Sequence, residues 1–130
     1  MTRTEMAKTQ REILGLTQRN LAEMIQVPQT YISKYESGED VKPEIVEKIH
    51  SGLTSVRDKM YPENTYERQI YTLNLHCALF GKSETFNDKI EYCNKMMRDI
   101  TFLIQFIMAD KKKFEQAQRS AAWKKGYSWR

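Results

Sequence analysis

The sequence predicts an all-α protein, and three observations lead to this prediction. Apolar residues recur at intervals of three and four along successive segments, which is the spacing of one face of a helix. Thr and Pro, which favour helix starts, precede several of these segments, and Gly follows some of them. The 130 residues include only three prolines and five glycines, which leaves little room for long linkers. This length allows one domain, or a small domain with an oligomerising extension.

The first predicted helix runs from Thr2 or Thr4, either of which can cap it, to a stop at Gly15. Its apolar side packs behind the segment that follows. The apolar residues are Met6, Ile13 and Leu14.

A short helix is predicted from Thr17 to Ile25. The Thr17 hydroxyl can accept a backbone N–H two or three residues on, which opens the helix. Leu21 and Ile25 share one face. Ala22 lies beside them, and its small side chain lets a second helix axis approach closely. The segment therefore favours a compact pair of helices.

The second helix of this pair is predicted from Pro28 to Glu36, because proline suits the first position of a helix. Val27 provides an apolar residue in the turn, Ile32 points inward, and Gly38 ends the helix with a left-handed residue. The outer arc of this helix is polar. It consists of Gln29, Thr30, Ser33 and Lys34.

Pro43 opens a further helix with apolar residues at core spacing. We expect an interruption near Ser51-Gly52, so that two helices complete a five-helix N-terminal domain. The best boundary is Tyr61-Pro62-Glu63-Asn64, because proline disfavours a helix at the residue before it. The predicted domains are residues 1–61 and residues 62–130.

Residues 65–80 are predicted as a helix that ends at Gly81, and a longer helix starts near Ser83, so the two form a hairpin. The long helix carries an apolar stripe that one neighbour cannot cover. We therefore expect a homodimer; the alternatives are that these faces pack back onto the N-terminal domain or receive a different protein. The predicted dimer or partner interface contains Ile90, Met97, Ile100, Ile104 and Ile107.

The N-terminal residues resemble the phage Cro and CI repressor class of helix-turn-helix proteins, also called the XRE family, over roughly residues 3–56. The resemblance implies a lambda-repressor-like domain. Two residues depart from the family pattern: Gln26 occupies a turn position where Gly is usual, and Pro28 replaces the usual Ser or Thr. A left-handed Gln costs about 1 kcal/mol. The matching residues are Leu16-Thr17-Gln18, Leu21-Ala22, Val27, Ile32-Ser33, Tyr35-Glu36 and Gly38, followed by Pro43.

The resemblance also implies roles for individual residues. Gln can pair with adenine and Lys with guanine through base edges in the major groove. Gln18 corresponds to a phosphate-binding glutamine that can also brace Gln29, and Arg11 and Glu36 correspond to a structural ion pair. The base-contacting set is Gln29, Thr30, Ser33 and Lys34. The phosphate-contacting set is Gln18, Arg19, Ser37 and Lys42.

Charge is unevenly distributed. The formal net charge is +4, yet residues 1–60 contain nine cationic and nine acidic residues, while residues 111–130 contain seven cationic residues and one acidic residue. This basic tail includes Trp123 and Trp129. It can grip a nucleic-acid backbone, dock onto an acidic partner, or pack its aromatic residues on the hairpin while its lysines stay in water.

No enzyme is predicted. The sequence lacks a phosphate-binding glycine loop and a nucleophile with an orienting base, and no cofactor is expected. Cys77 and Cys93 lack zinc or redox spacing and are expected to be core thiols; a metal corner of Cys77 and His76 is the alternative. With no apolar run of about 18 residues and no secretory signal, we expect a cytoplasmic protein.

These observations predict a sequence-specific DNA-binding regulator, a dimeric repressor that covers a promoter on double-stranded DNA. Its half-sites would lie about 34 Å apart on an inverted repeat. Helix-turn-helix modules also bind proteins. The alternative is therefore an interaction or inhibitor protein, of antitoxin or phage anti-defence type, whose C-terminal half binds another macromolecule while the N-terminal half controls its own gene.

Overall fold

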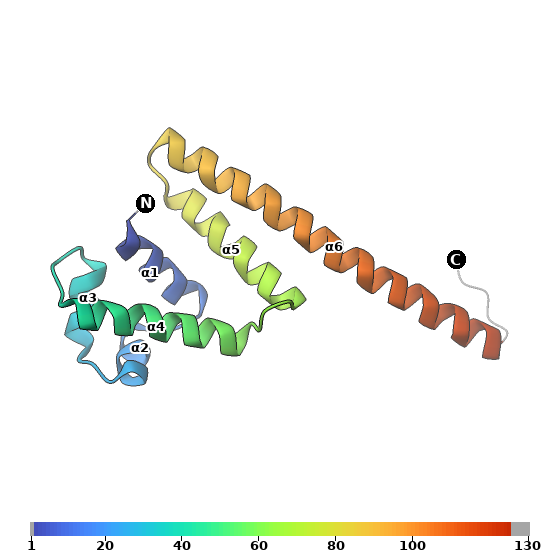
Figure 1. Ribbon diagram of the computed structural model, residues 1–130, viewed down its shortest axis with the longest axis horizontal. Helices are drawn as coiled ribbons and strands as arrows, with labels where there is room; N and C mark the ends of the chain where they lie inside the picture. Colours follow the sequence, from blue (N-terminus) through green and yellow to red (C-terminus); the bar gives the residue numbers. More distant parts are fainter. Residues whose placement is uncertain (1, 126–130) are drawn as a thin grey trace.

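The computed structural model describes residues 2–125, with side chains described for residues 2–112, 115, 116 and 119 (Figure 1). This part of the chain forms helices only, which confirms the predicted fold class. The six helices are α1 (Arg3–Ile13), α2 (Gln18–Ile25), α3 (Gln29–Glu36), α4 (Pro43–Met60), α5 (Tyr66–Lys82) and α6 (Phe86–Lys125).

The first four helices pack around a common core. The α2 helix contacts α3 and α4, and α1 contacts α3, α4 and α5. Figure 1 shows α3 near one end of the molecule, whereas the far part of α6 extends past the rest of the structure at the other end. The side chains buried deepest among these four helices are Leu21, Ile32, Ile49, Leu53 and Thr9.

Capping residues set the helix starts that the sequence predicts. The Thr2 side chain accepts the Glu5 N–H, and the Glu5 carboxylate accepts the Thr2 N–H in return. Thr65 caps α5 by accepting the N–H of Arg68 at 3.2 Å. Each cap gives a partner to a backbone donor that has none inside the helix. These threonines therefore explain why the helices begin where they do.

The predicted break near Ser51-Gly52 is wrong, because α4 is one helix of 18 residues. Only four helices precede the hairpin, not five. Gly52 does not end a helix; it allows α4 to pack closely against α2. A Cβ atom built at Gly52 would lie 2.4 Å from Ile25 Cγ2 of α2. Glycine thus lets α2 and α4 approach closely, and the hydrogen bonds of α4 continue through it.

The hairpin also differs in detail from expectation. The α5 helix includes Gly81 and ends one residue later, and the buried side of α6 is formed around Tyr92 and Asp99 instead of around the isoleucine stripe. Cys77 and Cys93 are both exposed, so the prediction of core thiols is wrong. The interfaces between α5 and its neighbours are filled by larger residues instead, including the buried Tyr71, Leu75 and Leu79 of α5.

The hairpin is joined to the N-terminal helices through α5. The Lys82 ammonium donates to the Thr9 hydroxyl of α1 at 3.0 Å and lies 3.5 Å from a Glu12 carboxylate oxygen. Buried residues from Ala7 to Tyr92 form one hydrophobic cluster. The hairpin therefore packs against α1 through both polar and apolar contacts.

The basic tail begins within α6. Lys111 and Lys112 are exposed, and Lys111 lies 3.8 Å from Glu115 one turn later. The side chains of Trp123 and Trp129, on which the sequence interpretation of the tail depends, lie outside the described residues.

Candidate nucleic-acid interface

The turn between α2 and α3 has a left-handed residue at Gln26, with φ of 58° and ψ of 49°. The Val27 N–H donates back to the Ala22 carbonyl at 3.1 Å, which closes the end of α2. Pro28 is the N-cap of α3, with ψ of 139°, so α3 begins at Gln29, one residue later than predicted. Proline still fits at the N-cap. Its fixed φ of about −65° suits this position, and the helix needs no hydrogen bond from an N–H group there.

The α3 helix is held by its apolar face. Ile32 is fully buried and Tyr35 is 7% exposed, and Leu21 and Ala22 of α2 are buried as well. The small Ala22 side chain leaves room for the two helices to contact each other. This packing determines which side of α3 faces outward.

A charged network fixes the last turn of α3. Arg11 of α1 donates to both Glu36 carboxylate oxygens, at 2.7 and 2.9 Å, and also to the Leu16 carbonyl at 2.7 Å. The Gln18 amide donates to Glu36 at 3.0 Å. The two charged side chains are 11% and 6% exposed. One carboxylate therefore connects α3 to both α1 and the start of α2.

The network also determines protonation. Burial raises the pKa of Glu36, but the hydrogen bonds from Arg11 and Gln18 outweigh it and hold that pKa below the ordinary value. The hydrogen bond to Glu36 raises the pKa of Arg11. Both groups therefore stay charged at neutral pH, as a two-point ion pair requires.

Tyr35 joins α3 to α4. Its hydroxyl lies 2.7 Å from His50 Nε2 in a hydrogen bond, and the two rings meet edge to face with centroids 5.7 Å apart. Burial lowers the pKa of His50, and the positive charge of Arg3 lowers it further, against the opposing effect of Glu47. In the folded protein at neutral pH, the neutral form of the His50 imidazole is therefore favoured.

The C-terminal end of α3 turns sharply at Gly38, which has φ of 84°. The Glu39 N–H donates to the Lys34 carbonyl at 3.0 Å and the Gly38 N–H to the Tyr35 carbonyl at 3.1 Å. This pair of bonds is the Schellman arrangement, in which glycine is favoured because it has no Cβ atom. The turn carries the chain away from α3 toward Lys42.

The outer side of α3 consists of polar side chains that lie outside the buried core of the described residues. All four predicted base-contacting residues are exposed. Within the described part of the chain, none of their side chains has a hydrogen-bond partner. The structure brings them together on one short helix. They are Gln29, Thr30, Ser33 and Lys34.

The predicted phosphate-contacting residues lie at the helix ends around α3. Arg19 and Lys42 are exposed, and Arg19 pairs with Glu23 one turn later at 3.2 Å. The Ser37 hydroxyl donates to the Ser33 carbonyl at 2.8 Å. Gln18 is half-buried, and its amide donates to Glu36 instead of bracing the Gln29 side chain.

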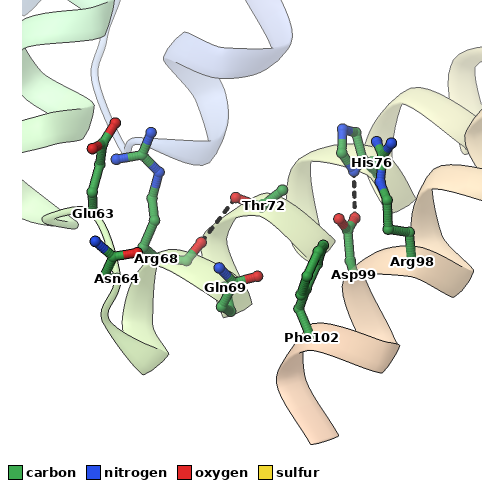
Figure 2. Close-up of a pocket in the computed structure, with 9 residues that line it drawn as sticks. All are labelled: Glu63, Asn64, Arg68, Gln69, Thr72, His76, Arg98, Asp99 and Phe102. Carbon is green, nitrogen blue, oxygen red and sulfur yellow. Dashed lines mark hydrogen bonds and ion pairs between the residues drawn. The ribbon is translucent and has the colours of Figure 1, made fainter. Parts of the chain in front are cut away.

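A second polar cluster lies between α5 and α6, and the sequence interpretation missed it. Figure 2 shows His76 of α5 and Asp99 of α6 facing each other; His76 Nδ1 is hydrogen bonded to a carboxylate oxygen of Asp99, which is 3% exposed. Arg68 and Arg98 line the same open cavity of about 350 Å³. The sequence carries no signal for this pair, since 23 residues separate its members and only the hairpin brings them together.

The described residues contain neither a cluster suited to a metal ion nor a membrane-spanning helix. No group of three or more His, Cys, Asp or Glu side chains there could hold a metal ion. Among the helices in the same part of the chain, none combines the length and the apolar content needed to cross a bilayer.

The pair α2 and α3, with its sharp turn and its polar outer arc, defines a helix-turn-helix unit. Comparison with protein families supports this assignment directly: residues 8–54 match the helix-turn-helix family HTH_3. The chain therefore contains a helix-turn-helix domain of the Cro/CI, or XRE, type, and such a domain implies DNA binding. Neither the curated proteins nor the solved structures include a match to this chain.

Proposed function

We propose that this chain is a sequence-specific DNA-binding regulator of transcription, a dimeric repressor of phage, mobile-element or toxin–antitoxin type that acts by occupying a promoter. We further propose that the protein is not an enzyme and that it acts in the cytoplasm. The observation that carries the proposal is the arrangement of α3. Its inner residues are buried or bonded to α1, α2 and α4, whereas its outer polar side chains have no internal partner.

A helix held in this way suits the major groove of DNA. Gln29 can pair with adenine N6 and N7, and Lys34 can donate to guanine O6 and N7. In this proposal Arg19, Ser37 and Lys42 contact phosphates, and these contacts set the register of the protein on the duplex. Because residues 1–60 carry no net charge, attraction of this domain to DNA depends on where its cations lie, such as Arg19, Lys34 and Lys42.

Selection of bound duplexes from a random pool, followed by affinity measurements, tests this function. Replacing Gln29 or Lys34 by Ala should cost about 1 to 3 kcal/mol on the selected site and much less on arbitrary DNA. Lys59→Ala is a matched control, because Lys59 is exposed near the far end of α4. Equal losses on selected and arbitrary duplexes would contradict base reading by α3.

A second function is favoured by the exposed apolar residues of α6. An interaction or inhibitor protein would use the C-terminal half to hold another macromolecule, while the N-terminal domain controls its own gene. The exposed stripe from Ile90 to Ile107 suits a helical partner protein. Purification of the full chain distinguishes the two functions: a stoichiometric protein retained through residues 65–130 favours the inhibitor, and a bound duplex alone favours the regulator.

A further inference from the structure

One face of α6 is an uncovered heptad stripe. Its residues follow one another at alternating intervals of four and three, the a and d spacing of a coiled coil. Every one of them is exposed, and the exposed fractions of the phenylalanine, methionine and isoleucine residues run from 45% at Ile100 to 77% at Phe86. The stripe, named here the α6 stripe, consists of Phe86, Ile90, Cys93, Met97, Ile100, Ile104 and Ile107.

The face of α6 next to the stripe is already occupied by α5. Tyr92 and Asp99 are buried there, and Asp99 is hydrogen bonded to His76 of α5. Lys89 lies over the Phe80 ring near the end of α5, and Tyr66, the first residue of α5, lines a cavity with Ile107 and Lys111. The α5 helix therefore accompanies α6 along the length of the α6 stripe, and the stripe residues stay exposed beside it.

We propose that the α6 stripe packs against the same stripe of a second copy in antiparallel orientation, so that two hairpins form a four-helix bundle. In an antiparallel pair, an a residue of one helix lies level with a d residue of the other. The stripe then covers itself in three kinds of layer. They are Ile90 with Ile107, Cys93 with Ile104, and Met97 with Ile100.

Charge decides between the two orientations. In a parallel, in-register pair, Lys111 would meet its own copy in the core and Asp110 would flank the second copy's Glu115, so both pairs repel. In the antiparallel pair, Lys111 lies level with Phe86, where its aliphatic stem can pack. Asp110 then comes level with the region of Lys89 in the second copy, whose ammonium lies over Phe80 of α5, and these two charges are opposite.

The length of the stripe agrees with this arrangement. It ends at Ile107, and exposed lysines follow at Lys111 and Lys112, near the position where α5 begins alongside α6. The overlap of two antiparallel copies is therefore the segment that α5 already supports. The inference rests on the dimer in the proposed function, and it adds which ends of the two chains lie together.

Cysteine cross-linking tests the orientation, with Cys77→Ala in every chain. In the antiparallel pair, Cys93 lies level with Ile104 of the second copy, so the two Cys93 residues are offset by eleven residues. This offset is about 16 Å along the helix axis at ~1.5 Å per residue. A disulfide needs Cα atoms within about 7 Å. Mild oxidation of this chain alone should therefore give no cross-linked dimer.

The same chain is then mixed with a differently tagged chain carrying Cys93→Ala and Ile104→Cys. We expect a disulfide between the two kinds of chain, seen by non-reducing electrophoresis and mass spectrometry. Since Ile104 is exposed, the substitution should leave helix content unchanged, which circular dichroism checks. A disulfide between two Cys93 residues would overturn the antiparallel orientation, and so would a mixture that stays uncross-linked.

Binding to the selected duplex is measured on the same samples, so the two proposals fail separately. A chain that binds the duplex but stays a monomer in light scattering at micromolar concentration overturns the α6 pairing and leaves DNA binding intact. A cross-linked antiparallel dimer that shows no preference among duplexes overturns the regulator and leaves the pairing intact.

Discussion

Arg11 joins three segments of the chain around α3. From α1 it reaches the Glu36 carboxylate of α3 and the Leu16 carbonyl before α2. We expect Glu36→Gln to lower the free energy of unfolding by about 3 kcal/mol, because breaking a buried ion pair leaves an uncompensated charge. Urea denaturation measures this, with the exposed Glu44→Gln as control.

The same substitution has a pH dependence with a defined sign. The folded pKa of Glu36 is lowered, so its contribution is present above the unfolded pKa and is lost as pH falls through the folded pKa. The stability difference between the natural chain and Glu36→Gln should therefore shrink in acid. A difference that stays constant down to the acid unfolding transition would show that the carboxylate charge is not the cause.

His50 predicts a second pH effect, in a higher range. Burial lowers its folded pKa, so below about 6.5 the unfolded chain takes up a proton that the folded chain resists. The free energy of unfolding should fall as pH drops from about 6.5, by at most about 1.4 kcal/mol per pH unit. His50→Gln keeps a polar partner for Tyr35 but does not titrate, so this part of the slope should disappear in chemical denaturation at pH 5 to 7.

At the scale of helices, Gly52 sets how closely α2 and α4 approach. Gly52→Ala places a Cβ atom 2.4 Å from Ile25 Cγ2, on a β-branched side chain that has little freedom to move. We expect a net loss of about 1 to 2 kcal/mol in thermal unfolding, since overpacking outweighs the gain of ~1 kcal/mol in helix propensity.

A matched substitution exists in α5. Gly81 also lies within a helix, but nothing stands within 4 Å of its Cβ position. Gly81→Ala should therefore leave stability equal or higher. Adding Ile25→Ala to Gly52→Ala removes the clashing atom, so this second change should cost less stability than it does in the natural chain. Equal effects of the two glycine substitutions would argue against close packing at Gly52.

Helix ends and the outward side of α3 could be predicted from the sequence, because they depend on local chemistry. Thr2, Thr17 and Thr65 cap helices through side-chain oxygens close in sequence, and Gly38 adopts the left-handed conformation that its position predicts. Gln26 adopts that conformation without being glycine, as the family resemblance implies. The outer arc of α3 follows from helical periodicity once Ile32 is placed inside.

Features that depend on packing between distant segments could not be predicted in this way. Gly52 reads as a helix break in isolation, and only the position of Ile25 shows that it allows close contact. Likewise, two faces of α6 could pack against α5: the apolar stripe and the face of Tyr92 and Asp99. The sequence does not indicate that α5 packs on the second of these faces. The exposure of Cys77 and Cys93 likewise depends on which sides of α5 and α6 meet, and the sequence alone does not show this.

For the whole molecule, the proposed dimer makes a direct prediction. Ile100→Asp places a charge in the middle of the α6 stripe, so the chain should become a monomer in light scattering. Its affinity for an inverted repeat should then fall roughly 100-fold, because the two domains no longer bind as one unit. Gln105→Asp adds the same charge at an exposed position of α6 outside the stripe and should change neither property. Dissociation by both variants would point to a general effect of charge on α6.

The bond from Lys82 to Thr9 also limits how this protein can be recombined with others. A gene fusion that kept only residues 1–61 would remove α5 from α1 and uncover Thr9, which is 1% exposed in the intact chain. A partner domain attached at Tyr61 would have to replace that cover. We therefore expect the smallest stable transferable unit to extend through Lys82, and chimeras that exchange only α6 should keep the duplex preference of the proposed regulator.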